Sequence, residues 1–349
     1  MKNKIFSVLV LLLVSLSSCT NQDTDFGNFD YQSVYFAYQF PVRTITLGED
    51  VFDTTLDNDY KCRIMATLGG VYNNDKDVTI DVEVANSLTS GLLFRTGGDP
   101  IVAMPSNYYS LESNKIVISK GQITGGIDVQ LTDAFFADPL SVKQTYVIPL
   151  QMTNVVNADT ILSGTPLVPN ANNNKAIIGQ WSSAPKDFIF YAIKYINPWD
   201  GFYLRRGVDV YTNTSNAAQN RTDVRRKQYV EQDDVFKVNT LSLSTIDFPV
   251  TYKDASGNNI NLNLVLTVDK ESGNITVSSS NPSSYTATGS GKFVKRGEKN
   301  SWGAKDRDAM YLSYNVNYSN FNISTTDTLV LRNRGVKAEV FTPDFNNLQ

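Results

Sequence analysis

Residues 77–84 read Asp77-Val-Thr-Ile-Asp-Val-Glu-Val84, and this alternation of polar and apolar side chains decides the fold class of the first half of the chain. In a β-strand, successive side chains point to opposite faces of the sheet, so the four apolar residues of this stretch share one face. The carboxylates at positions 77, 81 and 83 share the other face. We therefore expect a strand with one buried and one solvated face, as in an antiparallel sheet.

The same period of two recurs in short segments on both sides of residues 77–84. Strands are predicted at residues 33–38, 43–47, 61–68, 115–119, 126–131 and 145–152, with Gly and Asn clusters between them. One short helical turn is predicted at residues 133–136. This series of short antiparallel strands predicts an immunoglobulin-like β-sandwich over residues 31–153.

The second half of the chain predicts a separate all-β domain. Asn, Pro and Gly recur in residues 154–184, which we interpret as a linker, and residues 185–349 form the second domain. Its longer alternating segments lie at residues 202–211, 236–243, 246–252, 260–268, 274–279, 309–318 and 326–333. An antiparallel meander leaves two exposed edges unless it closes, so we expect a small lipocalin-like barrel or a sandwich. Residues 185–196 are the best candidate for a helix.

The first nineteen residues are typical of a bacterial lipoprotein precursor. Lys2 and Lys4 precede an apolar run that is too short to span a bilayer, and Leu16-Ser17-Ser18-Cys19 resembles the lipobox. We expect residues 1–18 to be a signal peptide, Cys19 to be lipidated, and residues 19–30 to be a flexible tether. The alternative is an ordinary signal peptide followed by an incidental cysteine.

Charge and composition exclude several classes of function. Loss of Lys2 and Lys4 with the signal peptide moves the net charge from −4 to −6, whereas a nucleic-acid partner calls for a basic face. Histidine is absent, which removes Ser-His-Asp and Cys-His catalysis and almost every zinc site. We therefore expect no nucleic acid, no metal and no cofactor. Cys62 lies in an alternating segment and is predicted to be a buried, inert thiol.

Enzymes that need only carboxylates, above all glycosidases, remain compatible with this composition. Asp77, Asp81 and Glu83 partly resemble the Asp-x-Asp-x-Glu pattern of chitinase-like glycosidases, but position 79 is threonine. Alternation also places Asp81 and Glu83 on a solvated face. The acidic segment 50–59 lacks the glycine turn of a calcium loop. The sequence therefore predicts no catalytic residues.

Aromatic residues offer the best candidates for binding, because the chain has 18 tyrosines and 3 tryptophans. Sugars present flat C–H faces to aromatic rings and hydroxyls to Asp, Asn and Arg side chains. The predicted carbohydrate-binding residues are Trp199, Asp200, Tyr203, Arg205 and Trp302. Packing in a core is the alternative for each ring. Trp181 is expected to seal the joint between the two domains.

Several segments resemble an uncharacterised domain that follows the lipid anchor of many Bacteroidetes surface lipoproteins. They are Arg43-Thr-Ile-Thr-Leu-Gly-Glu-Asp50, Pro105-Ser-Asn-Tyr-Tyr-Ser-Leu111, Ile116-Val-Ile-Ser-Lys-Gly121 and Tyr146-Val-Ile-Pro-Leu150. The likeness spans residues 30–152 and continues more loosely in the second half. The resemblance implies an accessory member of a starch-utilisation-like polysaccharide locus, which holds glycans at the cell surface beside an outer-membrane transporter.

The expected function is therefore that of a non-catalytic lipoprotein of the outer membrane, facing the cell exterior. It would bind an oligo- or polysaccharide and present it to a neighbouring transporter or to glycosidases. A second hypothesis is a structural or adhesive partner of an outer-membrane complex that touches no sugar. A third is a histidine-free hydrolase, although the residues after 185 are too few for a (β/α)₈ barrel of about 250 residues.

Overall fold

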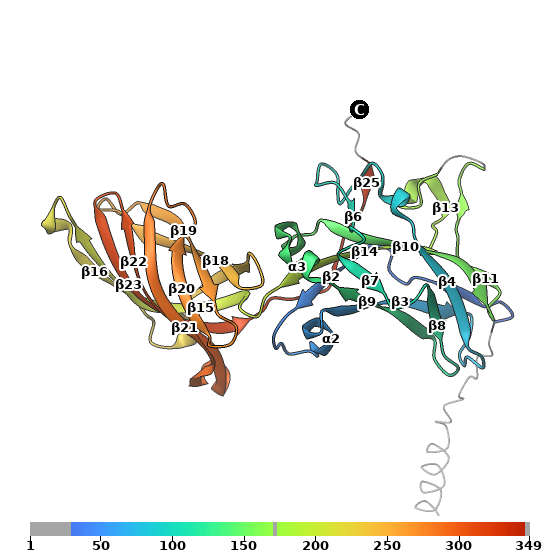
Figure 1. Ribbon diagram of the computed structural model, residues 1–349, viewed down its shortest axis with the longest axis horizontal. Coiled ribbons are helices and arrows are strands. Elements are labelled where there is room, and N and C mark those ends of the chain that lie inside the picture. Colours follow the sequence, from blue (N-terminus) through green and yellow to red (C-terminus); the bar gives the residue numbers. More distant parts are fainter. Residues whose placement is uncertain (1–28, 170–172, 346–349) are drawn as a thin grey trace, which may run out of the picture.

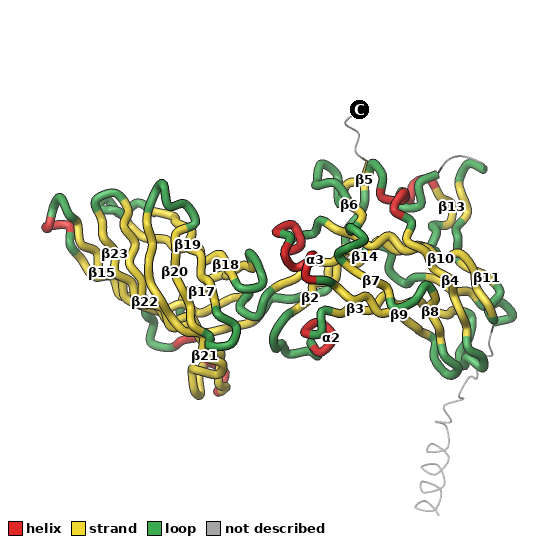
Figure 2. The backbone as a smooth tube through the Cα atoms, in the orientation of Figure 1, coloured by secondary structure: helices red, strands yellow, loops and turns green. Residues whose placement is uncertain are grey.

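The computed structural model describes residues 29–169 and 173–345, and these form two bodies built almost entirely of strands (Figure 1). Helical segments are confined to short turns at loop positions (Figure 2). The expected all-β class is confirmed, and of the two expected alternatives for the second half, a barrel or a sandwich, the structure has the barrel. The predicted signal peptide, Cys19 and most of the predicted tether lie outside the described residues. None of the helices in the described ranges has the length and apolar character needed to cross a bilayer.

The first body consists of two facing sheets. One sheet has the order β11 (Thr160–Ile161), β1 (Ser33–Tyr35), β3 (Lys61–Gly69), β9 (Thr124–Leu131) and β7 (Tyr109–Leu111). The other has the order β24 (Glu339–Val340), β2 (Pro41–Thr46), β14 (Phe188–Ile196), β10 (Tyr146–Val156), β4 (Val78–Val84) and β8 (Lys115–Ile118), with β6 (Val102–Ala103) beside β10. Two small ribbons pair β12 (Thr165–Pro166) with β13 (Trp181–Ser183), and β5 (Leu92–Leu93) with β25 (Asp344–Phe345).

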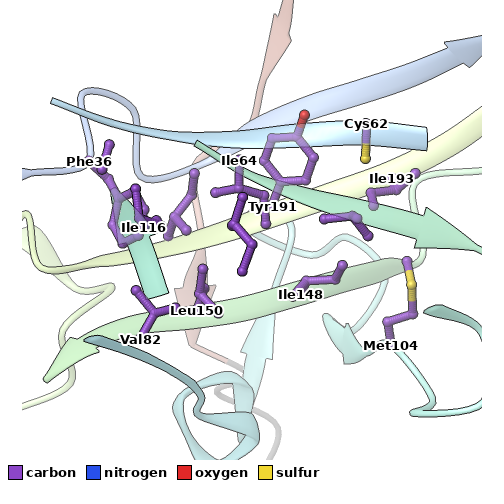
Figure 3. Packing of buried hydrophobic residues seen from close by; sticks show 14 of the residues in the cluster. Phe36, Cys62, Ile64, Val82, Met104, Ile116, Ile148, Leu150, Tyr191 and Ile193 are labelled. Atoms are coloured by element: carbon purple, nitrogen blue, oxygen red, sulfur yellow. The ribbon is translucent and has the colours of Figure 1, made fainter. Parts of the chain in front are cut away.

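The core of the first body lies between these two sheets. Figure 3 shows Ile64 of β3 facing Val82 of β4 and Leu150 of β10 across it. Val78, Ile80 and Val82 are buried as predicted, whereas Val84 at the strand end is 38% exposed. Cys62 is fully buried in this core, and burial raises the pKa of its thiol to about 12. The predicted burial is confirmed, and the raised pKa is a physical reason to expect an inert thiol.

The short helical elements connect these strands. They are α2 (Thr55–Asn58) and α3 (Asp133–Ala137), and six 3-10 turns at Asn86–Thr89, Pro139–Val142, Ile178–Gln180, Ala217–Gln219, Val230–Gln232 and Trp302–Ala304. The turn predicted at residues 133–136 corresponds to α3. The helix predicted at residues 185–196 is wrong, because this segment contains β14.

β14 also moves the domain boundary that the sequence suggested. It lies antiparallel to β10, with Leu150 opposite Ile189, and parallel to β2, with Ala192 opposite Val42. Strand β11 joins the first body too, so residues 154–184 do not connect the two bodies. The chain instead leaves the first body at residues 197–200. Trp181, expected at the joint, lies in the β12–β13 ribbon on the side of the first body remote from the barrel (Figure 1).

The second body is a closed eight-stranded barrel. Its strands follow chain order except for β16: β15 (Gly201–Asn213), β17 (Asp234–Thr240), β18 (Thr245–Lys253), β19 (Asn259–Val268), β20 (Asn274–Ser279), β21 (Thr286–Ser301), β22 (Lys305–Tyr318) and β23 (Phe321–Asn333). Pairing of β15 with β23 closes the ring. β16 (Arg221–Arg225) lies outside it, against the distal half of β15. Closure removes the two exposed edges that an open meander would leave.

Candidate functional site

Four of the five predicted carbohydrate-binding residues are buried at the entrance to the barrel. Their exposed fractions are 3% for Trp199, 4% for Asp200, 0% for Tyr203 and 6% for Arg205. The Trp199 ring packs edge-on against Phe293 with centroids 6.4 Å apart, and the Tyr203 hydroxyl donates to the Trp199 carbonyl at 2.8 Å. The expectation of an exposed aromatic platform here is therefore wrong.

Asp200 and Arg205 are occupied by structural partners. The Asp200 carboxylate accepts hydrogen bonds from the Thr240 backbone N–H at 2.7 Å and hydroxyl at 2.9 Å, and it pairs with Lys237. Arg205 pairs with buried Asp327 at 2.8 Å. Tyr203 and Arg205 are two residues apart on β15, so alternation directs both into the barrel. The sequence pattern could not show which face of this strand would be the inside.

Trp302 is the one predicted residue that remains partly exposed. It lies in the 3-10 turn at the tip of the β21–β22 hairpin. The Arg307 guanidinium carbon lies 3.6 Å from the centroid of its ring, and the indole N–H donates to the Leu331 carbonyl at 3.3 Å. One face of the ring is therefore covered by Arg307. Trp302 and the exposed Tyr229 both line a cavity of about 430 Å³.

A larger cavity of about 530 Å³, lined in part by Arg307, lies where the two bodies meet. We call it the junction cavity, and three segments form its walls: the loop after β2, the β21–β22 tip and the end of β23. The lining residues are Glu49, Asp50, Val51, Phe52, Arg296, Asp306, Arg307, Asp308, Leu331, Arg332, Asn333, Arg334, Gly335 and Val336. Its size falls within the range of small-molecule sites in proteins.

Most carboxylates of the junction cavity are held by neighbouring groups. Glu49 binds Lys295 of the hairpin, and this hydrogen bond lowers the pKa of Glu49. Asp306 accepts from the Asn300 backbone N–H at 3.0 Å and from Lys299, which lowers its pKa. The Asp308 carboxylate accepts from the Arg296 backbone N–H at 2.7 Å. The Glu49–Lys295 pair joins the first body to the second.

The Asp50 carboxylate has one oxygen that forms a hydrogen bond and one that does not. Its Oδ1 accepts from the Val51 backbone N–H at 2.6 Å, while its Oδ2 is buried and has no hydrogen-bond partner among the described residues. Beside it, Phe52 is 39% exposed and supplies an apolar ring. The cavity therefore combines free polar atoms with one ring face, which suits a ligand that carries both hydroxyls and C–H surface.

Arg334 fixes the wall of the junction cavity. Its buried guanidinium donates to the carbonyls of Asn197 and Asp200, each at 2.6 Å, and to those of Leu47 and Glu49 at 3.1 and 3.2 Å. Burial lowers the pKa of Arg334, although an arginine stays protonated in proteins. One side chain thus ties the loop after β2 to the connection between the bodies.

The hairpin tip carries unusual backbone strain. Arg296, Asn300 and Ala304 have φ values of 51°, 43° and 53°, in the left-handed region that L-residues other than glycine rarely adopt. They are three of the six such residues in the described part of the chain, within nine consecutive positions. Strain of this kind concentrates at functional sites, where the surrounding structure maintains it.

The chemistry of the junction cavity favours binding. A general acid needs a raised carboxyl pKa, whereas those of Glu49 and Asp306 are lowered. In the described ranges, no group of three or more His, Cys, Asp or Glu side chains is placed to hold a metal ion. The sequence did contain a signal for this site: residues 295–308 hold eight charged residues around Trp302 and interrupt the alternation of the barrel strands.

Comparison with solved structures shows close similarity to a Bacteroides ovatus protein of unknown function. The two chains are 45% identical, the match covers 91% of this chain and all of the other, and the TM-score is 0.86. A second B. ovatus protein of unknown function is 13% identical, covers 89% of this chain and 99% of its own, and has a TM-score of 0.40. A proposed carbohydrate-binding protein from B. ovatus ATCC 8483 is 10% identical, covers 88% and 97%, and has a TM-score of 0.27.

Two families match separate parts of the chain. Residues 198–335 match a domain of unknown function, DUF5627, and this range corresponds to the barrel. Residues 29–159 match a family described as a "-like, N-terminal domain", and this range lies in the first body. No curated protein matches the chain.

Proposed function

We propose, from the premise that this chain belongs to the same family as its 45% identical Bacteroides ovatus relative, that it is a non-catalytic glycan-binding lipoprotein. Lipid on Cys19 would hold it at the outer membrane, facing the exterior, and the junction cavity would bind an oligo- or polysaccharide. The bound glycan would then be presented to a neighbouring transporter or to glycosidases. No catalytic step belongs to this proposal.

The junction cavity is the observation that carries the proposal. Proteins bind sugars through planar polar side chains that pair with hydroxyls and through rings that cover C–H faces. Asp50, Asp308 and Asn333 supply oxygens and an amide, while Phe52 supplies the ring. The hydrogen bonds of Arg334 to four backbone carbonyls, which we call the Arg334 clamp, hold the cavity wall in place before a ligand arrives. This lowers the entropic cost of binding.

The position of the cavity along the molecule also supports the proposal. Strand β11, which pairs with β1 near the start of the described chain, lies at the end of the first body remote from the barrel (Figure 1). A lipid on Cys19 would therefore attach the membrane at that end, with the junction cavity beyond the first body. Such an arrangement leaves the cavity accessible to glycans in the medium.

Affinity electrophoresis and calorimetry against a panel of plant, microbial and host polysaccharides test the proposal. We expect binding by the intact chain, and Phe52→Ala to weaken it about fivefold or more, because a lost ring contact costs about 1 kcal/mol or more. Asp308→Asn changes a carboxylate of the cavity wall and should also weaken binding. Tyr38→Ala, at an exposed tyrosine of the first body, is the matched control and should bind normally. Absence of binding across the panel would refute the function, and unchanged binding by both cavity variants would refute this site.

The alternative function, a structural partner of an outer-membrane complex, is favoured by one observation. β16 pairs only with β15 among the described strands, so its outer edge has free backbone groups, and its Val224 is exposed. Such an edge can accept a strand from another chain. Co-purification of a stoichiometric membrane partner, lost on Val224→Pro and accompanied by no glycan binding, would support this alternative.

A further inference from the structure

We infer that the junction cavity takes an acidic glycan, one that carries carboxylate or sulfate groups, and that Arg307 and Arg332 recognise the negative charge. This inference rests on the proposed function and names the ligand class of the same site. It is carried by the arrangement of cations in the cavity wall.

Arg307 is held in one orientation without an acidic partner. Its Nε and Nη2 both donate to the Trp302 carbonyl at 3.2 Å, and its plane covers the Trp302 ring. No carboxylate of the described chain forms an ion pair with it: cross-strand Glu298 accepts instead from the Tyr311 hydroxyl at 2.7 Å. A guanidinium fixed in this way retains free N–H groups and loses little entropy when it binds an anion.

Arg332 places a second positive charge beside the first. The regular pairing of β22 with β23 ends at Ala309 opposite Val330, and Arg307 and Arg332 each lie two residues beyond that pair. Both residues line the junction cavity, and Arg332 is exposed and forms no ion pair with any described residue. Like charges that line one cavity repel each other. An anion bound between them would remove that repulsion.

The carboxylates of the cavity do not neutralise this pair. Glu49 binds Lys295, and Asp306 binds Lys299, both on the hairpin. The Asp308 carboxylate accepts from the Arg296 backbone N–H, and one Asp50 oxygen accepts from the Val51 backbone N–H. Arg307 and Arg332 therefore form no ion pair with a described carboxylate, and guanidinium groups bind carboxylates and sulfate-like anions through paired hydrogen bonds.

Calorimetry with matched oligosaccharides tests the inference. The probes are a galacturonate hexamer, the same hexamer with its carboxyls reduced to alcohols, and a chondroitin sulfate hexasaccharide. We expect an acidic probe to bind at least tenfold more tightly than the reduced one, and to bind more weakly as salt rises from 0.05 to 0.5 M, since salt screens exposed charges. The two acidic probes distinguish recognition of carboxylate alone from recognition that needs sulfate.

Two arginine variants test which residues recognise the negative charge of the glycan. Arg307→Gln and Arg332→Gln should each weaken the acidic probe about tenfold and leave thermal unfolding nearly unchanged. Lys120→Gln, which removes one exposed charge from the turn after β8 in the first body, should bind as the parent does. Equal affinity for acidic and reduced hexamers, or unchanged affinity in both arginine variants, would overturn the inference while leaving glycan binding intact. Binding of no oligosaccharide or polysaccharide at all would instead refute the proposed function.

Discussion

At the scale of single residues, Arg334 decides how the two bodies are joined. Its guanidinium donates to four carbonyls, of which those of Leu47, Asn197 and Asp200 are buried and that of Glu49 is partly buried. Arg334→Ala would leave these acceptors unpaired, and each buried unsatisfied group costs about 1–3 kcal/mol. We therefore expect a loss of about 3 kcal/mol or more in the free energy of unfolding, measured by urea denaturation.

The neighbouring Arg332 provides the control for this prediction. It is exposed and forms no ion pair with a described residue, so Arg332→Ala should change stability by about 0.5 kcal/mol or less. Limited proteolysis gives a second measurement, because loss of the clamp should open residues 197–200 to cleavage. If Arg334→Ala unfolded at the same urea concentration as the parent chain, the assigned role of Arg334 would be wrong.

Cys62 yields a prediction about chemical reactivity. Burial raises its thiol pKa to about 12 from the ordinary value of 9.0, so the reactive thiolate is scarce in the folded chain at pH 8. The test uses a Cys19→Ala chain, in which Cys62 is the one remaining cysteine of the sequence. We expect a thiol reagent to leave Cys62 unlabelled in buffer and to label it fully in guanidinium chloride, as measured by mass spectrometry. The raised pKa also stabilises the fold below pH 9, and this contribution declines between pH 9 and 12. Rapid labelling of the native chain would contradict this burial.

The candidate site could be predicted only in part at this scale. Residue type indicated that Trp199, Tyr203 and Trp302 were candidates for sugar stacking, but exposure depends on which face of a strand becomes the barrel interior. Trp199 and Tyr203 are enclosed, whereas Trp302 lies on a hairpin tip and stays partly open. Phe52 and Arg332 come from distant segments and meet only in the folded chain, so no local pattern identified them.

At the scale of elements, β14 shows why a strand can be mistaken for a helix. Its residues are nearly all apolar, so the period of two is hidden. In the structure Ile189, Tyr191 and Ile193 pack into the core between the sheets, while Phe188 and Phe190 pack into a second cluster on the other face. A strand buried on both faces reads as a continuous apolar run. Strands with one solvated face, such as β4, were predicted correctly because their alternation is visible.

The β21–β22 tip gives a prediction about strain. Ala304 is exposed and has a φ of 53°, a conformation that costs an L-residue about 1–2 kcal/mol. Ala304→Gly should therefore raise the stability of the barrel by about 0.5–1 kcal/mol, measured by thermal unfolding. Ala218→Gly, at an exposed alanine without positive φ, should lower it by a similar amount. A destabilising Ala304→Gly would show that the tip is not strained.

At the scale of the whole molecule, the chain crosses between the bodies twice. It enters the barrel through residues 197–200 and returns after β23, where β24 joins β2 and β25 joins β5 of the first body. The sequence predicted two all-β bodies, the second of them a barrel or a sandwich, because alternation and turn residues determine strands locally. It did not predict the return of the C-terminal segment, since two-residue strands such as β24 carry no periodic signal.

The return segment predicts a dependence of the first body on the C-terminal end of the described chain. Phe341 is buried against Phe40 and Phe94, with ring centroids 5.5 and 5.0 Å apart. Phe341→Ala should destabilise the first body by about 3 kcal/mol or more, because removal of a buried ring leaves a cavity. Calorimetry should show this as a lower melting temperature, while the exposed Val340→Ala changes it little. Equal effects of the two substitutions would argue against docking of this segment.

The proposed anchor gives the last prediction, which concerns where the whole molecule is held. A diacylglyceryl group with a further acyl chain binds a bilayer stably, since each buried methylene contributes about 0.8 kcal/mol. In a Bacteroides host we expect the wild-type chain in the membrane fraction, with an acylated N-terminal peptide by mass spectrometry, and Cys19→Ala in the soluble fraction. Cys62→Ala removes the other cysteine and should stay with the membrane. A membrane-bound Cys19→Ala chain, or an unacylated Cys19 in the wild type, would show that the chain is not held by a lipid on Cys19. The proposed orientation of the junction cavity, facing away from the membrane, would then have no support.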